Sequence, residues 1–467
     1  MRRFAFGTRA VAAATLLLAS AAAARAQTGS GAAERQALPF PVHARTLDNG
    51  LQVVAIPFDS PGIVTYVTVV RTGSRDEVEA GHSGFAHFFE HMMFRGTKKY
   101  SGEAYNELLK RMGADSNAFT SDDPTVYYIV GPAAELDTMF DMEADRFQNL
   151  AYTEEAFRTE AGAILGEYSR NASNPFLPIS EKLRDLAFDA HTYEHTTMGF
   201  LADIKQMPEK YQYSLSFFDR YYRPENVAVV VVGDVEPERV MALAQQHYGG
   251  WKKGYQAPAV KPEGAPQGPR RAHLDWATPT NPYLAVGYRT PAFAANRDWA
   301  TMAVIEQLLF AENAPLYQEL VVDKQWVDFV GGSADPHRDP YLFTISARVK
   351  TTDLLPQVES AIVAHLERLQ EAPVDPARLE RVKSHLRYAY ALSLDTPRAV
   401  AFEVAQAIWL TGDPQDINRY WAEIDRVTPA DVQRVAREIF QEKGQSVVTL
   451  AHPAPAAGNA TQGGASR

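Results

Sequence analysis

The pattern of hydrophobic and polar positions predicts the same succession of elements twice along the chain. The first series is a strand at 64–70, a helix around 87–91, a strand ending at 126–130, a helix at 133–147 and a closing strand at 227–232. The second series is a strand at 283–288, a helix at 298–310, a strand at 341–347, a helix at 352–369 and a closing strand at 446–450. This repetition indicates a duplicated α+β unit.

Composition along the chain predicts where the two units meet. Residues 252–271 are rich in Pro, Gly, Ala and charged side chains, which favours an extended linker. We therefore expect a first domain at 45–252, a linker at 253–272 and a second domain at 273–452. About 425 residues would suit two cores better than one.

Both ends of the chain look different from the domains. Arg2 and Arg3 precede an apolar stretch at 11–24 and the small-x-small sequence Ala24-Arg25-Ala26, which predicts a secretory signal peptide at 1–26. The stretch is short for a membrane anchor, so we expect no span in the mature protein. The signal peptide predicts a periplasmic or secreted location. Residues 27–44 are expected to be flexible and the tail 453–467 to be disordered.

Composition also excludes several kinds of chemistry. The chain of 467 residues has no cysteine, which excludes disulfides and thiolate ligands. Its net charge of −11 argues against a nucleic-acid partner. Histidine and carboxylate side chains remain as candidate ligands for a metal.

One motif supplies such ligands. The sequence His-Phe-Phe-Glu-His at 87–91 places His87 and His91 at positions i and i+4 of a helix, on one face, with Glu90 beside them. This is the inverted form of the zincin motif, in which two imidazoles bind zinc and the carboxylate acts on water. The alternative interpretation is an ordinary apolar helix that carries two incidental histidines.

A catalytic zinc normally has three protein ligands, so one more is needed. The segment 153–170 begins with a Thr N-cap, continues with carboxylates in its first turn and predicts a helix. Glu160 and Glu167 lie seven residues apart on one face of this helix. One of them could bind the metal and the other support the site, and spacing alone does not rank them.

The run at 81–97 around this motif closely resembles the pitrilysin/insulysin family, which includes mitochondrial processing peptidases. The resemblance implies two homologous metallopeptidase-type α/β domains that form a clamshell, the second of them inactive. It also implies one Zn²⁺ per chain held by His87, His91 and Glu167, with Glu90 as general base and Glu160 as a supporting catalytic carboxylate. The implied activity is endopeptidase cleavage of peptides or flexible protein segments.

The resemblance extends to a strand beside the zinc, at 114–120 in this sequence. In the family the backbone of this strand pairs with the substrate, which makes Asn117, Ala118 and Phe119 candidate substrate-binding residues. The alternative interpretation is a polar turn that leads into a strand.

One departure from the family concerns the second domain. Self-sufficient members carry an Arg followed seven residues later by a Tyr, and here the corresponding positions hold Val321 and Asp328. The resemblance therefore implies a heterodimer with a related subunit that bears the Arg and Tyr, or a homodimer. A non-catalytic scaffold or assembly subunit is the alternative function.

Overall fold

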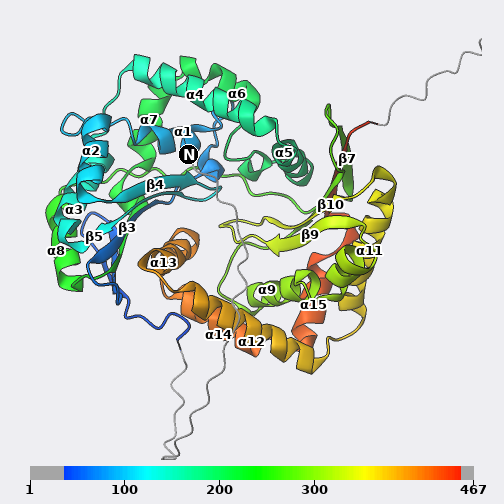
Figure 1. Ribbon diagram of the computed structural model, residues 1–467. Coiled ribbons are helices and arrows are strands. Elements are labelled where there is room, and N and C mark those ends of the chain that lie inside the picture. Colours follow the sequence, from blue (N-terminus) through cyan, green and yellow to red (C-terminus); the bar gives the residue numbers. More distant parts are fainter. Residues whose placement is uncertain (1–35, 454–467) are drawn as a thin grey trace, which may run out of the picture. The chain divides into compact units, whose positions relative to one another are not determined.

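The computed structural model describes residues 36–453 (Figure 1). The predicted signal peptide at 1–26 lies outside these residues, as do 27–35 and the tail from 454 onward. None of the helices in the described part of the chain is long and apolar enough to cross a membrane.

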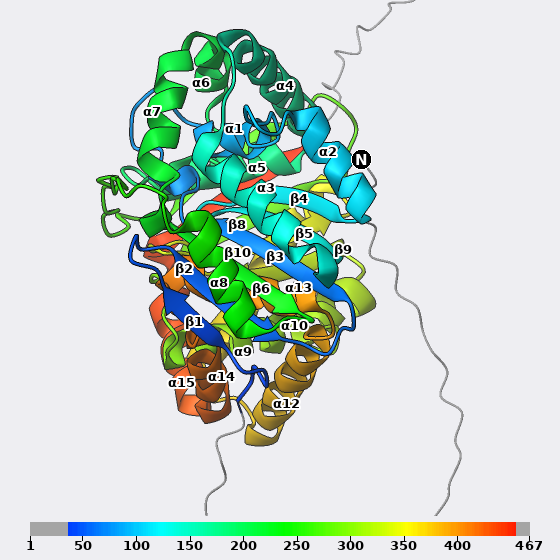
Figure 2. The same cartoon turned by 90° about the vertical axis from the view of Figure 1, so that its left-hand side faces the viewer.

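The first half of the described chain forms a six-stranded sheet in the order β1-β2-β6-β3-β5-β4 (Figure 2). Its strands are β1 (His43–Thr46), β2 (Gln52–Pro57), β3 (Ile63–Val70), β4 (Asp115–Thr120), β5 (Thr125–Pro132) and β6 (Val227–Gly233). Its helices are α1 (Phe85–Met92), α2 (Gly102–Met112), α3 (Leu136–Asn149), α4 (Glu154–Ala172), α5 (Phe176–Ala187), α6 (Leu201–Gln206), α7 (Tyr211–Tyr221) and α8 (Pro237–Tyr248).

The second half forms a five-stranded sheet in the order β7-β11-β8-β10-β9. Its strands are β7 (Arg270–Asp275), β8 (Tyr283–Arg289), β9 (Val327–Ala334), β10 (Leu342–Val349) and β11 (Gln445–Ala451). Its helices are α9 (Arg297–Phe310), α10 (Pro315–Tyr317) with a π-helical continuation at Gln318–Asp323, α11 (Leu355–Glu371), α12 (Pro376–Ser393), α13 (Pro397–Thr411), α14 (Asp416–Arg426) and α15 (Pro429–Ile439).

The two sheets match strand by strand. Apart from the additional β1, the order β2-β6-β3-β5-β4 corresponds to β7-β11-β8-β10-β9. In the first sheet, β6 runs parallel to β2 and antiparallel to β3. In the second sheet, β11 likewise runs parallel to β7 and antiparallel to β8. The predicted duplication into two homologous α+β domains is confirmed.

Each half also lends one helix to the sheet of the other half. Alternate side chains of β2 point to opposite faces of the first sheet, so Val53 packs against helices of its own half and Val54 packs against α13. In the same way α5, through Ile179 and Leu183, covers the face of the second sheet that carries Val448. The hydrophobic pattern predicted two separate cores and did not predict this exchange.

Two predicted boundaries need correction. Leu38 is fully buried in the cluster around α13, and its N–H donates to Asn418 Oδ1 at 2.9 Å. Residues 36–44, predicted to be flexible, are thus held by apolar packing and end in β1. The predicted linker 253–272 already contains the start of β7 at Arg270, and Glu263 Oε2 accepts hydrogen bonds from the N–H groups of 189–191.

Buried charges join the halves beside the first sheet. Asp122, in the turn after β4, binds Arg184 of α5 through two hydrogen bonds and faces His337 Nε2 of the second half at 2.9 Å. Burial would raise the pKa of Asp122, but Arg184 and His337 hold it well below its usual range. Burial opposes a charge on His337 as well, yet the bond to Asp122 raises its pKa. Asp123 also faces His337, and the ring of Tyr341 stacks on the imidazole of His337.

This pairing predicts a pH-dependent contribution to stability. Because the pKa of His337 is raised, its stabilising effect is complete below its unfolded pKa of about 6.5 and is lost as the pH rises through the folded value. The melting temperature of wild type should therefore be higher than that of His337→Gln. This difference should be largest at mildly acidic pH and should shrink as the pH rises. His385→Gln, at an exposed position, is the control. A difference that does not change with pH would contradict this interpretation.

Candidate metal centre

Helix α1 presents two different faces. Phe85, Phe88, Phe89 and Met92 are fully buried in the core of the first half, and His87 and His91 lie on the other side of the helix with Glu90. The apolar stripe that the alternative interpretation proposed is present, and it anchors the helix. The stripe and the histidine face therefore coexist on one helix.

Two features fix the start of α1. Gly84, the residue before the helix, has φ of +88°, and a Cβ atom there would lie 2.8 Å from the carbonyl oxygen of Met198. The buried carboxylate of Glu77 accepts hydrogen bonds from the N–H groups of Gly84 at 2.7 Å and Ala86 at 2.6 Å. Glu77 thus satisfies two backbone donors at the helix N-terminus. Burial raises its pKa well above the usual range, and the bonds from Gly84 and Ala86 partly offset this effect.

Helix α4 brings the two candidate glutamates to α1. As predicted, Thr153 is its N-cap, and the side chain accepts a hydrogen bond from the N–H of Ala156. The ring of Phe157 packs against Phe88 with centroids 4.9 Å apart, which holds the two helices together. Of its two glutamates, Glu167 faces the Nε2 atoms of the histidines, and Glu160 faces Nδ1 of His91.

Glu167 faces the Nε2 atoms. Its Oε2 lies 3.5 Å from His91 Nε2 and 4.0 Å from His87 Nε2, and one ligand atom from each of the three residues lies within 4.8 Å of the other two. This is the one such group of three metal-binding side chains found in residues 36–453. Ligand atoms around a tetrahedral zinc with bonds of about 2.1 Å are about 3.4 Å apart, so small side-chain shifts suffice.

Glu160 faces the other nitrogen of one ring. Its Oε1 lies 2.8 Å from His91 Nδ1, and its second oxygen accepts a hydrogen bond from Arg95. Glu160 is only 3% exposed, and although burial would raise its pKa, His91 and Arg95 lower it. A proton on His91 Nδ1 donated to this carboxylate leaves the lone pair of Nε2 directed at the position between the three residues.

The chemistry of the donor set fits zinc. Burial, together with neighbouring His91, lowers the pKa of His87 to about 4, so this ring is neutral near physiological pH. Its Nδ1 is buried without a hydrogen-bond partner in the described chain. Two imidazoles with one carboxylate are the ligand set of a catalytic zinc site that leaves a fourth position open.

Glu90 lies beside this group and is tied to the edge of the first sheet. Its Oε2 accepts a hydrogen bond of 2.6 Å from Thr120 Oγ1, at the end of β4. Burial raises the pKa of Glu90, and the bond from Thr120 and the charge of His91 partly offset this effect. A carboxylate with a raised pKa is better suited to accept and return a proton near neutral pH.

Strand β4 forms one edge of the first sheet, with β5 as its single neighbour among the described strands. Of the candidate substrate-binding residues, Ala118 is buried on the face that carries α1, and Asn117 is exposed. Phe119 points to the opposite face, where its ring lies 6.0 Å from that of Phe402 of α13. The side chains thus diverge, and what the three residues share is the backbone of a sheet edge beside Glu90.

The two positions that depart from the family pattern lie in the second half. Val321 belongs to the π-helical turn and packs against the second core. Asp328 lies on β9, where it accepts hydrogen bonds from Asn281 at 2.8 Å and Arg348 at 3.1 Å and pairs with Lys350. Its charge is thus satisfied within the chain, and neither side chain can replace an Arg and Tyr pair.

Sequence reasoning missed three residues that support the site: Thr120, Arg95 and Glu77. Thr120 lies in the stretch considered for substrate binding, but its bond to Glu90 spans 30 positions and leaves no local signal. Arg95 lies four residues after His91, a spacing that could have suggested it. Glu77 precedes a glycine-containing turn, and no pattern in that turn marks it as a cap.

Comparison with known families decides the relationship. Residues 53–200, which include His87, His91 and Glu167, match the insulinase (peptidase family M16) domain, and residues 210–386 match the peptidase M16 inactive domain. The chain belongs to the insulinase (M16) family of peptidases. This family is the one that the sequence around the motif resembles, and a peptidase is the activity supported at family level.

Individual relatives are similar over most of their length. The chain is 29% identical to the zinc protease PqqE of Helicobacter pylori over 87% of this chain and 91% of that protein. It is 26% identical to a probable mitochondrial-processing peptidase subunit beta of Schizosaccharomyces pombe, over 86% and 89%. The crystal structure of a protease from Helicobacter pylori has a TM-score of 0.84 at 28% identity and covers 89% of this chain and all of that one.

A further structure supports the fold alone. The first half of the periplasmic protease PqqL from Escherichia coli has a TM-score of 0.72 at 20% identity, and it covers 88% of this chain and 92% of that one.

Proposed function

We propose that the chain is a zinc-dependent endopeptidase that hydrolyses peptides or flexible protein segments, with one zinc ion bound by His87, His91 and Glu167. The observation that carries this proposal is the convergence of the three ligand atoms on one point, with the carboxylate of Glu90 beside them. The names of the relatives support zinc and proteolysis for the family.

Each residue has a distinct task in this proposal. Zinc would supply Lewis-acid chemistry, polarising a peptide carbonyl and making water acidic near neutral pH. Glu90 accepts a proton from the attacking water and then returns it to the leaving amine. Thr120 holds the carboxylate of Glu90 in place, and Glu160 orients the ring of His91. Arg95 in turn neutralises Glu160.

The substrate would bind as an added strand. The edge of β4 that no described strand pairs with offers backbone N–H and C=O groups at Asn117, Ala118 and Phe119, next to the carboxylate that acts on water. Pairing of this kind requires an extended segment, which favours peptides and unfolded parts of proteins over folded ones.

Val321 and Asp328 occupy the positions where self-sufficient members of the family carry an Arg and a Tyr, which favours a partner subunit. We infer a heterodimer with a related chain that supplies an Arg and a Tyr to the substrate, or else a homodimer. One relative is named as a subunit of a mitochondrial-processing peptidase. We also infer export to the periplasm or beyond, since the predicted signal peptide requires it.

The second candidate function is a scaffold or assembly subunit. The observation that favours it is the match of residues 210–386 to a domain described as inactive. A scaffold would not require the ligands that the first half retains, so the peptidase is preferred.

Cleavage of a mixed-sequence quenched fluorescent peptide pool tests the proposal. The zinc-loaded protein is compared with the same protein after chelation, each alone and with a candidate partner of the family. Zinc-dependent cleavage, alone or with the partner, is the expected result. Cleavage by this chain without a partner would overturn the heterodimer inferred from Val321 and Asp328. Stoichiometric zinc with no cleavage in any combination would favour the scaffold.

A further inference from the structure

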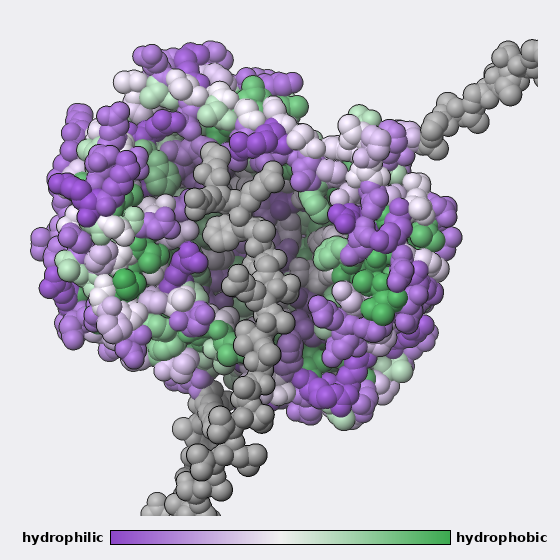
Figure 3. Space-filling model, viewed as in Figure 1, coloured by the Kyte–Doolittle hydropathy of each residue, from purple (hydrophilic) through white to green (hydrophobic). Residues whose placement is uncertain are grey.

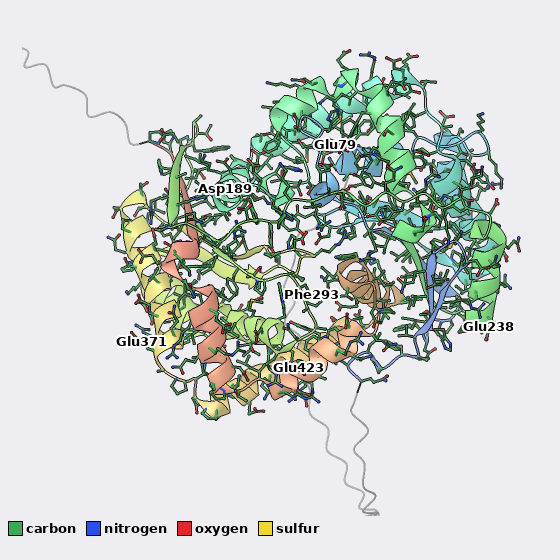
Figure 4. The ribbon with its side chains drawn as sticks, turned by 180° about the vertical axis from the view of Figure 1, so that it is seen from behind. Glu79, Asp189, Glu238, Phe293, Glu371 and Glu423 are labelled. Carbon is green, nitrogen blue, oxygen red and sulfur yellow. The ribbon has the colours of Figure 1, made fainter. Side chains whose placement is uncertain are left out.

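A cavity lies in the second half of the chain, and none of the residues that line it belongs to the metal centre. It has a volume of about 270 Å³ and is bounded by α12, α13, α14, the start of α9 and the segments that follow β8 and β9. Phe293, labelled near the middle of Figure 4, is part of its wall. Ligand pockets usually measure about 300–1,000 Å³, so this cavity suits a single side chain or a small molecule.

Its wall is a connected series of five aromatic rings. Tyr390 stacks on Trp421 with centroids 4.2 Å apart, and Trp421 meets Tyr420 edge to face at 5.9 Å. Phe293 continues the series, 5.9 Å from Tyr420 and 5.2 Å from Trp299. Aromatic faces carry a negative quadrupole that attracts cations, most strongly where water is excluded.

One acidic side chain enters the same cavity without a partner. Glu403 lies on the side of α13 opposite the first sheet, and no hydrogen bond or ion pair to it occurs within residues 36–453. Burial raises its pKa. Asp416, the other carboxylate of the wall, is already paired with Arg419. A half-buried carboxylate without a cation is costly, and the cost falls when a cation binds.

A buried hydroxyl adds an independent sign of a missing ligand. The Oη atom of Tyr390 is inaccessible to solvent and has no hydrogen-bond partner of good geometry, although Trp421 lies against its ring. Tyr390 is more than nine-tenths buried, with 8% of the residue exposed. Buried polar atoms are nearly always bonded, so each exception calls for an explanation.

We propose that this cavity, formed by Tyr390, Trp421, Tyr420, Phe293 and Glu403, binds an organic cation with a guanidinium, ammonium or quaternary ammonium group. The aromatic faces hold the apolar surface of the cation, and Glu403 neutralises its charge. The cation has two possible sources, the basic side chain of a peptide and a free small amine. The metal centre has no part in this binding.

Titration of the zinc-loaded protein, followed by calorimetry and tryptophan fluorescence, tests the proposal. The probes are N-acetylarginine amide and tetramethylammonium chloride, with N-acetylcitrulline amide as the neutral match of the first and sodium chloride as the ionic-strength control. We expect saturable binding of a cationic probe and none of the neutral one. Tighter binding of the arginine probe indicates a peptide side chain, and tighter binding of tetramethylammonium indicates a free amine.

Three variants locate the binding. Glu403→Gln keeps the shape of the side chain and removes its charge, so it should weaken cation binding about tenfold to a hundredfold. Trp421→Phe should weaken it less and also reduce the change in fluorescence. Glu371→Gln, on α11 and labelled far from the cavity in Figure 4, should bind as wild type does. Absence of saturable binding, equal binding of the citrulline probe or unchanged binding by Glu403→Gln would overturn the proposal.

Discussion

Glu90→Gln is expected to lower the rate of peptide cleavage by about a hundredfold to ten-thousandfold, the range that a general base contributes. The amide cannot accept a proton from water, but it has the size of the carboxylate and can still accept the hydrogen bond from Thr120. Zinc content should therefore remain that of wild type. The measurement is kcat for a fluorogenic peptide, together with bound zinc per chain.

Glu103→Gln is the matched control for this variant. Glu103 is exposed in the first turn of α2, and its replacement should change neither zinc content nor kcat. If Glu90→Gln kept the wild-type rate, another group would be the base and the proposed role of Glu90 would be wrong.

The second large effect separates the two carboxylates of α4. Glu167→Gln replaces the carboxylate that faces both Nε2 atoms with a neutral amide, and it should abolish stoichiometric zinc binding. Glu160→Gln alters a neighbour of His91 Nδ1, and a change of this kind costs about tenfold to a hundredfold in metal affinity. Competition with a zinc-binding dye measures both affinities.

Glu155→Gln, exposed in the first turn of α4, controls for removing a charge from this helix. It should bind zinc as wild type does. A larger loss of affinity in Glu160→Gln than in Glu167→Gln would show that the roles are reversed.

Local signals predicted much of the fold. The N-cap Thr153 and the acidic first turn that follows it correctly predicted where α4 begins. The apolar runs became β3, β6, β8 and β11 within one or two residues of their predicted bounds. These features depend on neighbours in the chain, so the sequence alone carries them.

Long-range packing could not be predicted in this way. The apolar faces of α5 and α13 indicate that each helix is covered, but not that each covers the sheet of the other half. Asp122 and His337 are 215 positions apart, and no spacing rule connects them.

The candidate metal centre was also predictable only in part. Helical spacing placed His87, Glu90 and His91 together, and it placed Glu160 and Glu167 on one face of α4. Their division of labour depends on which nitrogen each carboxylate meets, and this follows from the packing of Phe157 on Phe88. The supporting bond from Thr120 likewise depends on how β4 lies beside α1.

The surface agrees with the composition. Hydrophilic side chains dominate the face shown in Figure 3, and hydrophobic residues gather there in small patches. Such a surface is ordinary for an acidic chain with a net charge of −11.

Anomalous diffraction at the zinc absorption edge, from crystals of the zinc-loaded protein, tests directly whether His87, His91 and Glu167 bind the metal. We expect one strong peak within about 2.0–2.2 Å of His87 Nε2, His91 Nε2 and a carboxylate oxygen of Glu167. A peak at other residues, or none at this site in protein that carries stoichiometric zinc, would contradict this expectation.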